Sequence, residues 1–304
     1  MPTSLHVDEI PVDLALVRRL LAASVPKLAD RPLTPLPATG SSNVLFRLGD
    51  DLLVRVPRQP GGAASIEKEA RWLPHVAPAL PVGTPEVVAV GEPAAGYPER
   101  WSVVRWVEGQ TPGGPGDVAP ADLVAVLEAF RRAEVPDGAH ADGALRWYRG
   151  GPLAEVDEDL RETLVECREL AWLDLDLDAV AACWDLALDA ARSRRAPSLR
   201  WYHGDLLAEN LLVCDGRLAA VLDFGGLGVG DPAVDLMAAW EVLDAPGRRE
   251  LRDALEVDEA TWLTAAGWAL LVAVVTFPYY GETMKSRCAS RLAMARAVLE
   301  DLGH

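Results

Sequence analysis

The segment 202–225 constrains the fold of this chain more than any other part of the sequence. Within it, two short apolar runs, 211–214 and 218–222, flank the dipeptide Asp215-Gly216. An Asp-Gly pair between two apolar runs favours a type I′ turn, which requires positive φ at both central residues. We therefore predict a hairpin of two short antiparallel strands. The residues just before and just after this hairpin are then expected to lie close together.

Three polar side chains stand at the two ends of the predicted hairpin. Asp205 and Asn210 precede it in the run HGDLLAEN, and Asp223 follows it in Asp-Phe-Gly. Phosphoryl transfer needs a carboxylate near the attacking hydroxyl, and hard oxygen ligands for a Mg²⁺ that bridges the phosphates of the donor. Asp-x4-Asn or Asp-Phe-Gly alone occurs often by chance. The order, the spacing and the hairpin between them make the set specific.

Protein kinases carry the same groups in the same order. Histidine and glycine before Asp205, in place of a His-Arg-Asp run, resemble the aminoglycoside phosphotransferase family of kinase-like small-molecule kinases. The resemblance implies that Asp205 is the catalytic base or orients the acceptor hydroxyl, and that Asn210 and Asp223 bind Mg²⁺. His203 is then a structural residue that braces the loop. Glu209 departs from the family's pattern, and it either adds negative charge beside the metal or points to solvent.

The resemblance also implies an α+β fold of the bilobal, protein-kinase-like type. A small, β-rich N-terminal lobe (1–107) would bind the nucleotide, and a larger, mostly helical C-terminal lobe (108–304) would hold the catalytic and acceptor sites. A stretch rich in Gly and Pro, 109–120, marks the boundary. Patterns of apolar residues predict the five strands of the first lobe at 33–39, 44–48, 52–56, 87–90 and 101–107.

The turn Gly40-Ser41-Ser42-Asn43 lies between the first two predicted strands. Small side chains let backbone N–H groups and hydroxyls approach phosphates closely, so this turn suits a phosphate-covering loop. In the family this is the loop that positions the nucleotide. Such a turn is also an ordinary connection between strands, and its place ahead of the sheet favours the functional interpretation.

Arg55 stands on the strand where kinases carry a lysine that holds the α- and β-phosphates. A planar guanidinium differs from an ammonium in reach, but it can grip phosphates with two hydrogen bonds. Glu69 faces inward on a predicted helix, 65–76, and a buried carboxylate needs a partner, for which Arg55 is the candidate. The alternatives are an arginine on the strand surface and a solvated Glu69. By resemblance, backbone groups around Val104 and Trp106 would bind the adenine.

Helical periodicity dominates the C-terminal part, at 121–135, 153–170, 177–193, 259–277 and 283–302. A Gly-rich connector, 136–151, carries the aromatic and basic run WYR. Asp231 is expected to cap a helix that begins at Pro232. Asp235 resembles the aspartate that braces the catalytic loop of kinases. The residues that we expect to line an acceptor site lie in the bend after the fourth helix: Tyr279, Tyr280 and Glu282.

The net charge of −17 argues against a nucleic-acid partner, because no basic surface is available to displace counterions. Residues 1–107 carry eleven basic and eleven acidic side chains, whereas residues 108–304 carry eighteen and thirty-five. An acidic acceptor cleft would concentrate a cationic substrate. The alternative is that acidic helix faces only keep the protein soluble.

Cysteine usage and hydropathy give the expected location. The four cysteines show no metal-binding spacing, so we expect small buried side chains in a reducing compartment. Residues 1–10 lack the basic and apolar regions of a signal peptide. The longest apolar run, 263–277, is shorter than the ~20 residues needed to span a bilayer. We expect a cytoplasmic protein without a membrane partner.

The predicted reaction is transfer of the γ-phosphate of ATP, or of GTP, to a hydroxyl of a small molecule. A cationic acceptor such as an aminoglycoside or a related antibiotic fits the charge distribution, which makes antibiotic resistance the expected role. Within enzymes, the alternative acceptors are a sugar, an amino alcohol, a nucleoside or a macrolide. The alternative from another class is a catalytically silent, kinase-like binding module.

Overall fold

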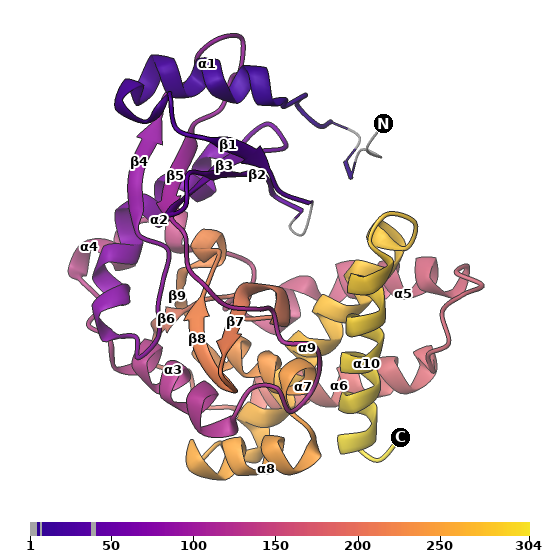
Figure 1. The fold of residues 1–304 in the computed structure, drawn as a ribbon. Helices are drawn as coiled ribbons and strands as arrows, with labels where there is room; N and C mark the ends of the chain where they lie inside the picture. Colours follow the sequence, from indigo (N-terminus) through magenta and orange to yellow (C-terminus); the bar gives the residue numbers. More distant parts are fainter. Residues whose placement is uncertain (1–4, 7, 38–40) are drawn as a thin grey trace.

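The computed structural model describes residues 5–6, 8–37 and 41–304, and it has the predicted bilobal α+β architecture (Figure 1). The small lobe contains one five-stranded antiparallel sheet in the order β1-β2-β3-β5-β4. Its elements are α1 (Leu14–Ser24), β1 (Leu33–Pro35), β2 (Asn43–Leu48), β3 (Leu52–Pro57), α2 (Ala63–Val76), β4 (Val87–Gly91) and β5 (Trp101–Arg105). Gly40 of the predicted phosphate loop lies outside the described residues.

The core of the small lobe forms between the sheet and α1. The apolar face of this helix is buried at Leu16, Val17, Leu20 and Leu21, and it packs against inward-facing strand residues such as Val54 and Val103. Asp13 caps the start of the helix, because its carboxylate accepts a hydrogen bond from the Leu16 amide at 2.6 Å. This packing holds the strands that carry the predicted nucleotide-binding residues.

The large lobe is built mainly from helices. They are α3 (Pro120–Arg132), α4 (Asp137–Ala141), α5 (Asp157–Arg168), α6 (Leu177–Ser193), α7 (Ala239–Val242), α8 (Ala245–Ala254), α9 (Glu259–Tyr280) and α10 (Lys285–Asp301). Two short sheets accompany them: β6 (Arg200–Tyr202) pairs with β9 (Gly228–Gly230), and β7 (Leu211–Cys214) pairs with β8 (Arg217–Val221). The predicted helix 153–170 is divided, because a 3₁₀ turn at Leu153–Val156 precedes α5.

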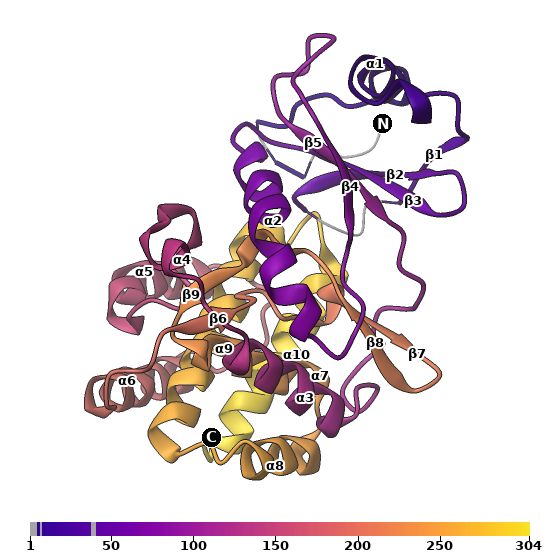
Figure 2. The ribbon, with the colours of Figure 1, turned by 90° about the vertical axis from the view of Figure 1, so that its left-hand side faces the viewer.

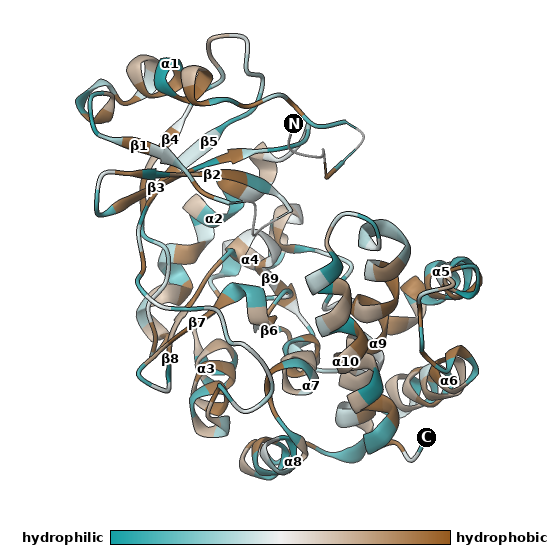
Figure 3. Ribbon diagram, turned by 45° about the vertical axis from the view of Figure 1, so that its right-hand side comes forward, coloured by the Kyte–Doolittle hydropathy of each residue, from teal (hydrophilic) through white to brown (hydrophobic). Residues whose placement is uncertain are grey.

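Helix α9 forms the centre of this lobe and is coloured brown along most of its length (Figure 3). Its backbone approaches α6 closely at Gly267, where a Cβ atom would lie 2.8 Å from the Cβ of Ala187. Among the described residues, α9 is the one helix long and apolar enough to cross a membrane, but 78% of its apolar window is buried inside the protein. This confirms the prediction of a buried helix, and α9 extends three residues beyond the predicted end at residue 277.

Helix α2 belongs to both lobes. Figure 2 shows it running from the sheet down to the elements of the large lobe. Its second half contributes Trp72, Leu73 and Val76 to the hydrophobic core of the large lobe. The Trp72 indole N–H also donates to Asp142 at 3.0 Å. The packing of the second half in the large lobe therefore fixes the position of the first half, which carries Glu69.

The hairpin β7–β8 confirms the prediction from Asp215-Gly216. Both residues have positive φ, 50° and 74°, as a type I′ turn requires. The Leu222 amide donates to the Asn210 carbonyl at 2.8 Å, which ties the residue before the hairpin to the residue after it. Cys214 on β7 is exposed, contrary to the expectation that all four cysteines are buried.

Candidate active site

The loop that carries Asp205 is braced from the side of the large lobe. The carboxylate of Asp235 accepts hydrogen bonds from the backbone amides of His203, at 2.6 Å, and Gly204, at 2.7 Å. The His203 ring lies 4.9 Å from the Phe224 ring and donates from Nε2 to the Leu222 carbonyl at 2.9 Å. His203 therefore joins the two polar segments, which is the structural role expected for it.

Asp205 and Asn210 are in direct contact. The Asn210 side-chain amide donates to the Asp205 carbonyl at 2.8 Å and to its carboxylate at 2.9 Å. The second carboxylate oxygen forms an ion pair with Arg149. Burial acts to raise the pKa of Asp205, but the Arg149 guanidinium, assisted by His203 and Arg291, outweighs it and holds the pKa below its ordinary value. Asp205 is therefore ionised and is held from two sides.

Asp223 follows the hairpin in a left-handed backbone conformation, with φ 55° and ψ 72°. Such a conformation is strained for a residue with a side chain and is common at functional sites. Burial raises the pKa of Asp223, against the influence of Arg55. A partly buried carboxylate of this kind gains from a nearby cation.

The donor chemistry of the site fits Mg²⁺. Both amide protons of Asn210 are directed at Asp205, which leaves its Oδ1 as an acceptor, and Asp223 supplies carboxylate oxygens. Within the described part of the chain, no cluster of three or more His, Cys, Asp or Glu side chains could hold a metal alone. A kinase-type Mg²⁺ needs only one or two protein ligands besides phosphate oxygens and water.

The predicted pair of Arg55 and Glu69 is present and is buried. Arg55 donates to both carboxylate oxygens of Glu69, and its Nε donates to the Ser102 hydroxyl at 3.2 Å. Glu69 in turn accepts the Phe224 amide at 3.1 Å. Three of the five N–H donors of Arg55 are thereby used, and two remain for a phosphate. The pair connects the sheet, α2 and the segment of Asp223.

The residues predicted to hold the nucleotide occupy the strands and loop above this cluster. Asn43 begins β2, and Val104 lies on β5, between β3 and β4. Ser41 contacts the large lobe, because its hydroxyl accepts from Arg287 of α10 at 3.1 Å, and the neighbouring Ser42 carbonyl accepts the Arg58 amide. The Trp106 amide donates to Asp51 at 2.9 Å, so an adenine contact there would use the Trp106 carbonyl. The roles of all five in nucleotide binding stay predictions.

Glu209 is ion-paired within the protein and does not point freely to solvent. It forms ion pairs with Arg291 at 2.7 Å and Arg287 at 3.4 Å, both from α10. Arg291 is also paired with Glu241, whose other oxygen accepts the Ala208 amide at 2.8 Å. The charge of Glu209 is therefore balanced within the protein. Of the predicted acceptor residues, Tyr279 is 55% exposed and Glu282 is exposed as well.

Two cations at the site were not among the predicted residues. Lys68 lies on α2, and its ammonium is 5.9 Å from the ring centre of Trp147. Burial lowers the pKa of Lys68 to about 8, against the attraction of Asp223. Its spacing of four residues from the buried Trp72 is the signal that could have identified it. Arg149 has no such signal, because it lies in an irregular connector.

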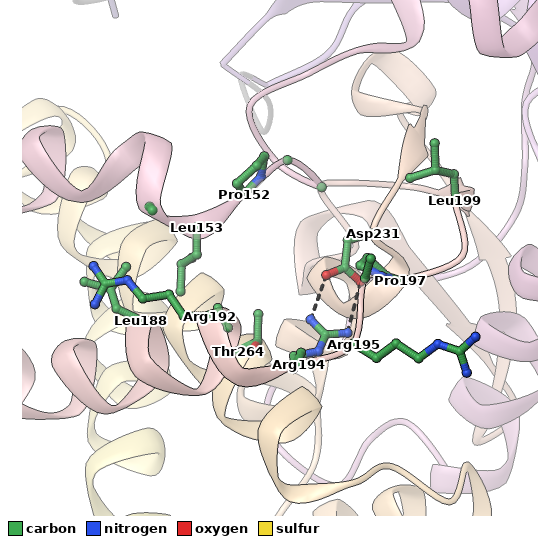
Figure 4. A pocket seen from close by; sticks show the side chains of 15 residues that line it. Pro152, Leu153, Leu188, Arg192, Arg194, Arg195, Pro197, Leu199, Asp231 and Thr264 are labelled. Carbon is green, nitrogen blue, oxygen red and sulfur yellow. Dashed lines mark hydrogen bonds and ion pairs between the residues drawn. The ribbon is translucent and has the colours of Figure 1, made fainter.

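A cavity of about 440 Å³ lies elsewhere in the large lobe. Figure 4 shows the Arg194–Asp231 ion pair in it, with Leu153 on one side and Leu199 on the other. Asp231 also caps the 3₁₀ helix that begins at Pro232, as expected. None of the predicted site residues lines this cavity, so it is separate from the cluster around Asp205.

Comparison with known proteins agrees with this geometry. A model of the phosphotransferase enzyme family matches residues 33–269, from β1 to the middle of α9. The chain belongs to this family. As one of its members, the protein is a phosphotransferase. No curated protein matches the chain.

Solved structures share the fold of this phosphotransferase at low sequence identity. The GDP complex of wild-type aminoglycoside 2'-phosphotransferase-IIIa is 19% identical, with a TM-score of 0.65 over 95% of this chain and 98% of that chain. The streptomycin–ATP ternary complex of APH(2")-IIa is 17% identical, with a TM-score of 0.61 over 95% and 99%. The macrolide 2'-phosphotransferase MphH from Brachybacterium faecium is 23% identical, with a TM-score of 0.60 over 95% and 98%. These similarities extend over both lobes.

Proposed function

We propose that this phosphotransferase transfers the γ-phosphoryl group of a nucleoside triphosphate to a hydroxyl of a small molecule, with Mg²⁺ as cofactor. The observation that supports the proposal is the placement of Asp205 and Asn210, which are in contact, before the hairpin and of Asp223 just after it, within reach of the charge of Asp205. Asp205 would orient the acceptor hydroxyl and take its proton. Asn210 and Asp223 would hold Mg²⁺, which neutralises phosphate charge when bound. A cytoplasmic location, where the triphosphate is available, belongs to the same proposal.

The ion pair of Arg55 and Glu69 supports a nucleotide site between the lobes. Arg55 is fixed by a two-pronged contact, and its remaining N–H groups suit the α- and β-phosphates. Ser41, Ser42 and Asn43 would cover the phosphates. ATP and GTP both remain candidate donors, since the related structures were solved with GDP and with ATP.

A small-molecule antibiotic is the acceptor class that we propose. Structures with this fold include enzymes for aminoglycosides and for macrolides. The acid excess of residues 108–304 favours a cationic acceptor. The carboxylates closest to the catalytic loop are balanced by arginines, as Asp205 is by Arg149 and Glu209 by Arg291. Attraction of a cation would therefore come from the wider surface of the lobe.

The test is transfer of labelled phosphate from ATP or GTP to a panel of aminoglycosides, macrolides, sugars and amino alcohols, with and without Mg²⁺. We expect Mg²⁺-dependent transfer to one class, and a loss of at least ~10²-fold in rate in Asp205→Ala. Transfer to none of the aminoglycosides would remove the cationic antibiotic but not the kinase. Absence of Mg²⁺-dependent turnover of any triphosphate in the wild type would favour the silent binding module.

A further inference from the structure

The connector 136–151 packs against the catalytic loop, which is the loop 203–210 that carries Asp205. The ring of Trp147 lies so close to Gly204 and Gly226 that a Cβ atom on these residues would stand 3.1 Å and 2.8 Å from its carbons. Gly204 also has φ +79°, a conformation that favours glycine. The Asp231 amide donates to the Gly150 carbonyl at 2.9 Å. The connector is therefore built against the site and is not a loose linker.

Arg149 is the residue that this connector directs at Asp205. Its side chain is only 11% exposed, and its guanidinium carbon lies 4.7 Å and 5.5 Å from the ring centres of Trp147 and Tyr148. Nη1 donates to the Gly204 carbonyl at 3.1 Å and pairs with Asp205, while Nε donates to the Tyr148 hydroxyl at 2.9 Å. Across the described ranges of the chain, no acceptor contacts Nη2. A largely buried guanidinium is thus held by three hydrogen bonds, with two N–H groups still available.

The position of these two N–H groups matches a requirement of phosphoryl transfer. Asp205 is the residue that would hold the attacking hydroxyl, so a guanidinium bonded to it stands beside the oxygen that meets the γ-phosphorus. Negative charge spreads over the three equatorial phosphoryl oxygens in the transition state. A planar guanidinium can donate to these oxygens without losing its contact with a carboxylate. Arg55 also has two free N–H groups, but it is bound to Glu69 and not to Asp205, so it is not placed by the residue that would hold the attacking hydroxyl.

We propose that Arg149 is a catalytic residue that donates hydrogen bonds from Nη2 to the γ-phosphoryl group. The inference rests on the proposed function. In the transfer, the acceptor oxygen forms a bond to the γ-phosphorus while the bond to the bridging oxygen breaks, and that electron pair leaves with the nucleoside diphosphate. The hydroxyl proton moves to Asp205. Arg149 keeps its own proton and stabilises the charge on the group in transit.

The experiment compares nucleotides that differ only in the γ-phosphate. Calorimetry with Mg²⁺ gives the affinities of ADP and of a β,γ-imido analogue of ATP for the wild type, Arg149→Gln and Arg149→Lys. We expect ADP affinity to stay within about 2-fold and analogue affinity to fall by about 10-fold or more in Arg149→Gln, as for loss of a charge-assisted hydrogen bond. Arg149→Lys should recover part of the loss, since it keeps the charge but not the fork. The turnover number should fall by about 10³-fold in Arg149→Gln.

Arg146→Gln is the matched control, because this exposed arginine lies in the same connector and its side chain, among the described residues, hydrogen-bonds to the His140 carbonyl alone, at 3.5 Å. It should change neither affinity nor rate. An unchanged ratio of analogue to ADP affinity in both Arg149 variants overturns the inference, whatever the rate. Failure of the wild type to bind these adenine nucleotides and also GDP and the β,γ-imido analogue of GTP would instead contradict the proposed function, so the two failures can be told apart.

Discussion

Replacing Glu69 with glutamine tests the buried ion pair that joins the two lobes. The side chains of Arg55 and Glu69 are only 8% and 2% exposed, so the substitution leaves a buried guanidinium without a counter-charge. Glutamine keeps an oxygen for the Phe224 amide, which limits the change to the pair. Breaking such a pair from one side costs about 3–5 kcal/mol. At roughly 2 °C per kcal/mol for a chain of this size, the Tm should fall by about 6–10 °C.

The assay is thermal unfolding followed by circular dichroism, with two further variants. Glu67→Gln is the control, since Glu67 is half exposed and pairs with the partly exposed Arg100, and its loss should cost less than about 1 kcal/mol. The double variant Arg55→Met/Glu69→Gln removes the unpaired charge and should regain most of the lost stability while remaining unable to bind nucleotide tightly. A double variant no more stable than Glu69→Gln would refute the reasoning that the orphaned charge is the main cost.

Three other residues at the site give separate expectations. Asp235→Ala leaves the His203 and Gly204 amides without an acceptor. The free energy of unfolding, measured by chemical denaturation, should fall by about 1–3 kcal/mol for each amide, and hydrogen exchange of both amides should become faster. Unchanged exchange would contradict the bracing role. Gly226→Ala would put a Cβ 2.8 Å from the His203 carbonyl oxygen, so we expect about 1–3 kcal/mol of destabilisation in the same assay. A variant as stable as the wild type would show that the backbone of the loop moves to make room for the methyl group. Lys68→Met should weaken binding of ADP several-fold in calorimetry and Lys68→Arg less, because a nearby cation would be lost; equal affinities would exclude Lys68 from the nucleotide site.

The sequence was sufficient to predict what depends on local pattern. Asp215-Gly216 between two apolar runs predicted the hairpin, and the hairpin brought Asn210 next to Leu222 without further information. The pairing of Arg55 with Glu69 followed from the strand–helix order and from the inward face of the helix. In each case the decisive residues lie on a regular element or in the tight turn that joins two of them, where local rules of spacing apply.

Contacts between irregular segments could not be predicted in the same way. Arg149 and Asp205 are separated by 56 residues, and the connector that carries Arg149 has no periodicity from which its direction could be read. Glu209 is balanced by Arg291, 82 residues away on α10, and the pairing depends on how that helix packs under the catalytic loop. Net charge, summed over the lobe, did not reveal that these carboxylates are neutralised where chemistry would occur.

The packing of α2 against both lobes has a consequence for regulation. To withdraw Glu69 from Arg55, the helix would have to pull Trp72, Leu73 and Val76 out of the large-lobe core, at about 1.5–3 kcal/mol for each side chain. A swinging helix is therefore an expensive off-switch for this enzyme. We expect the Arg55–Glu69 pair to stay formed, so that the rate of the enzyme depends on the concentrations of its two substrates and not on a movement of α2.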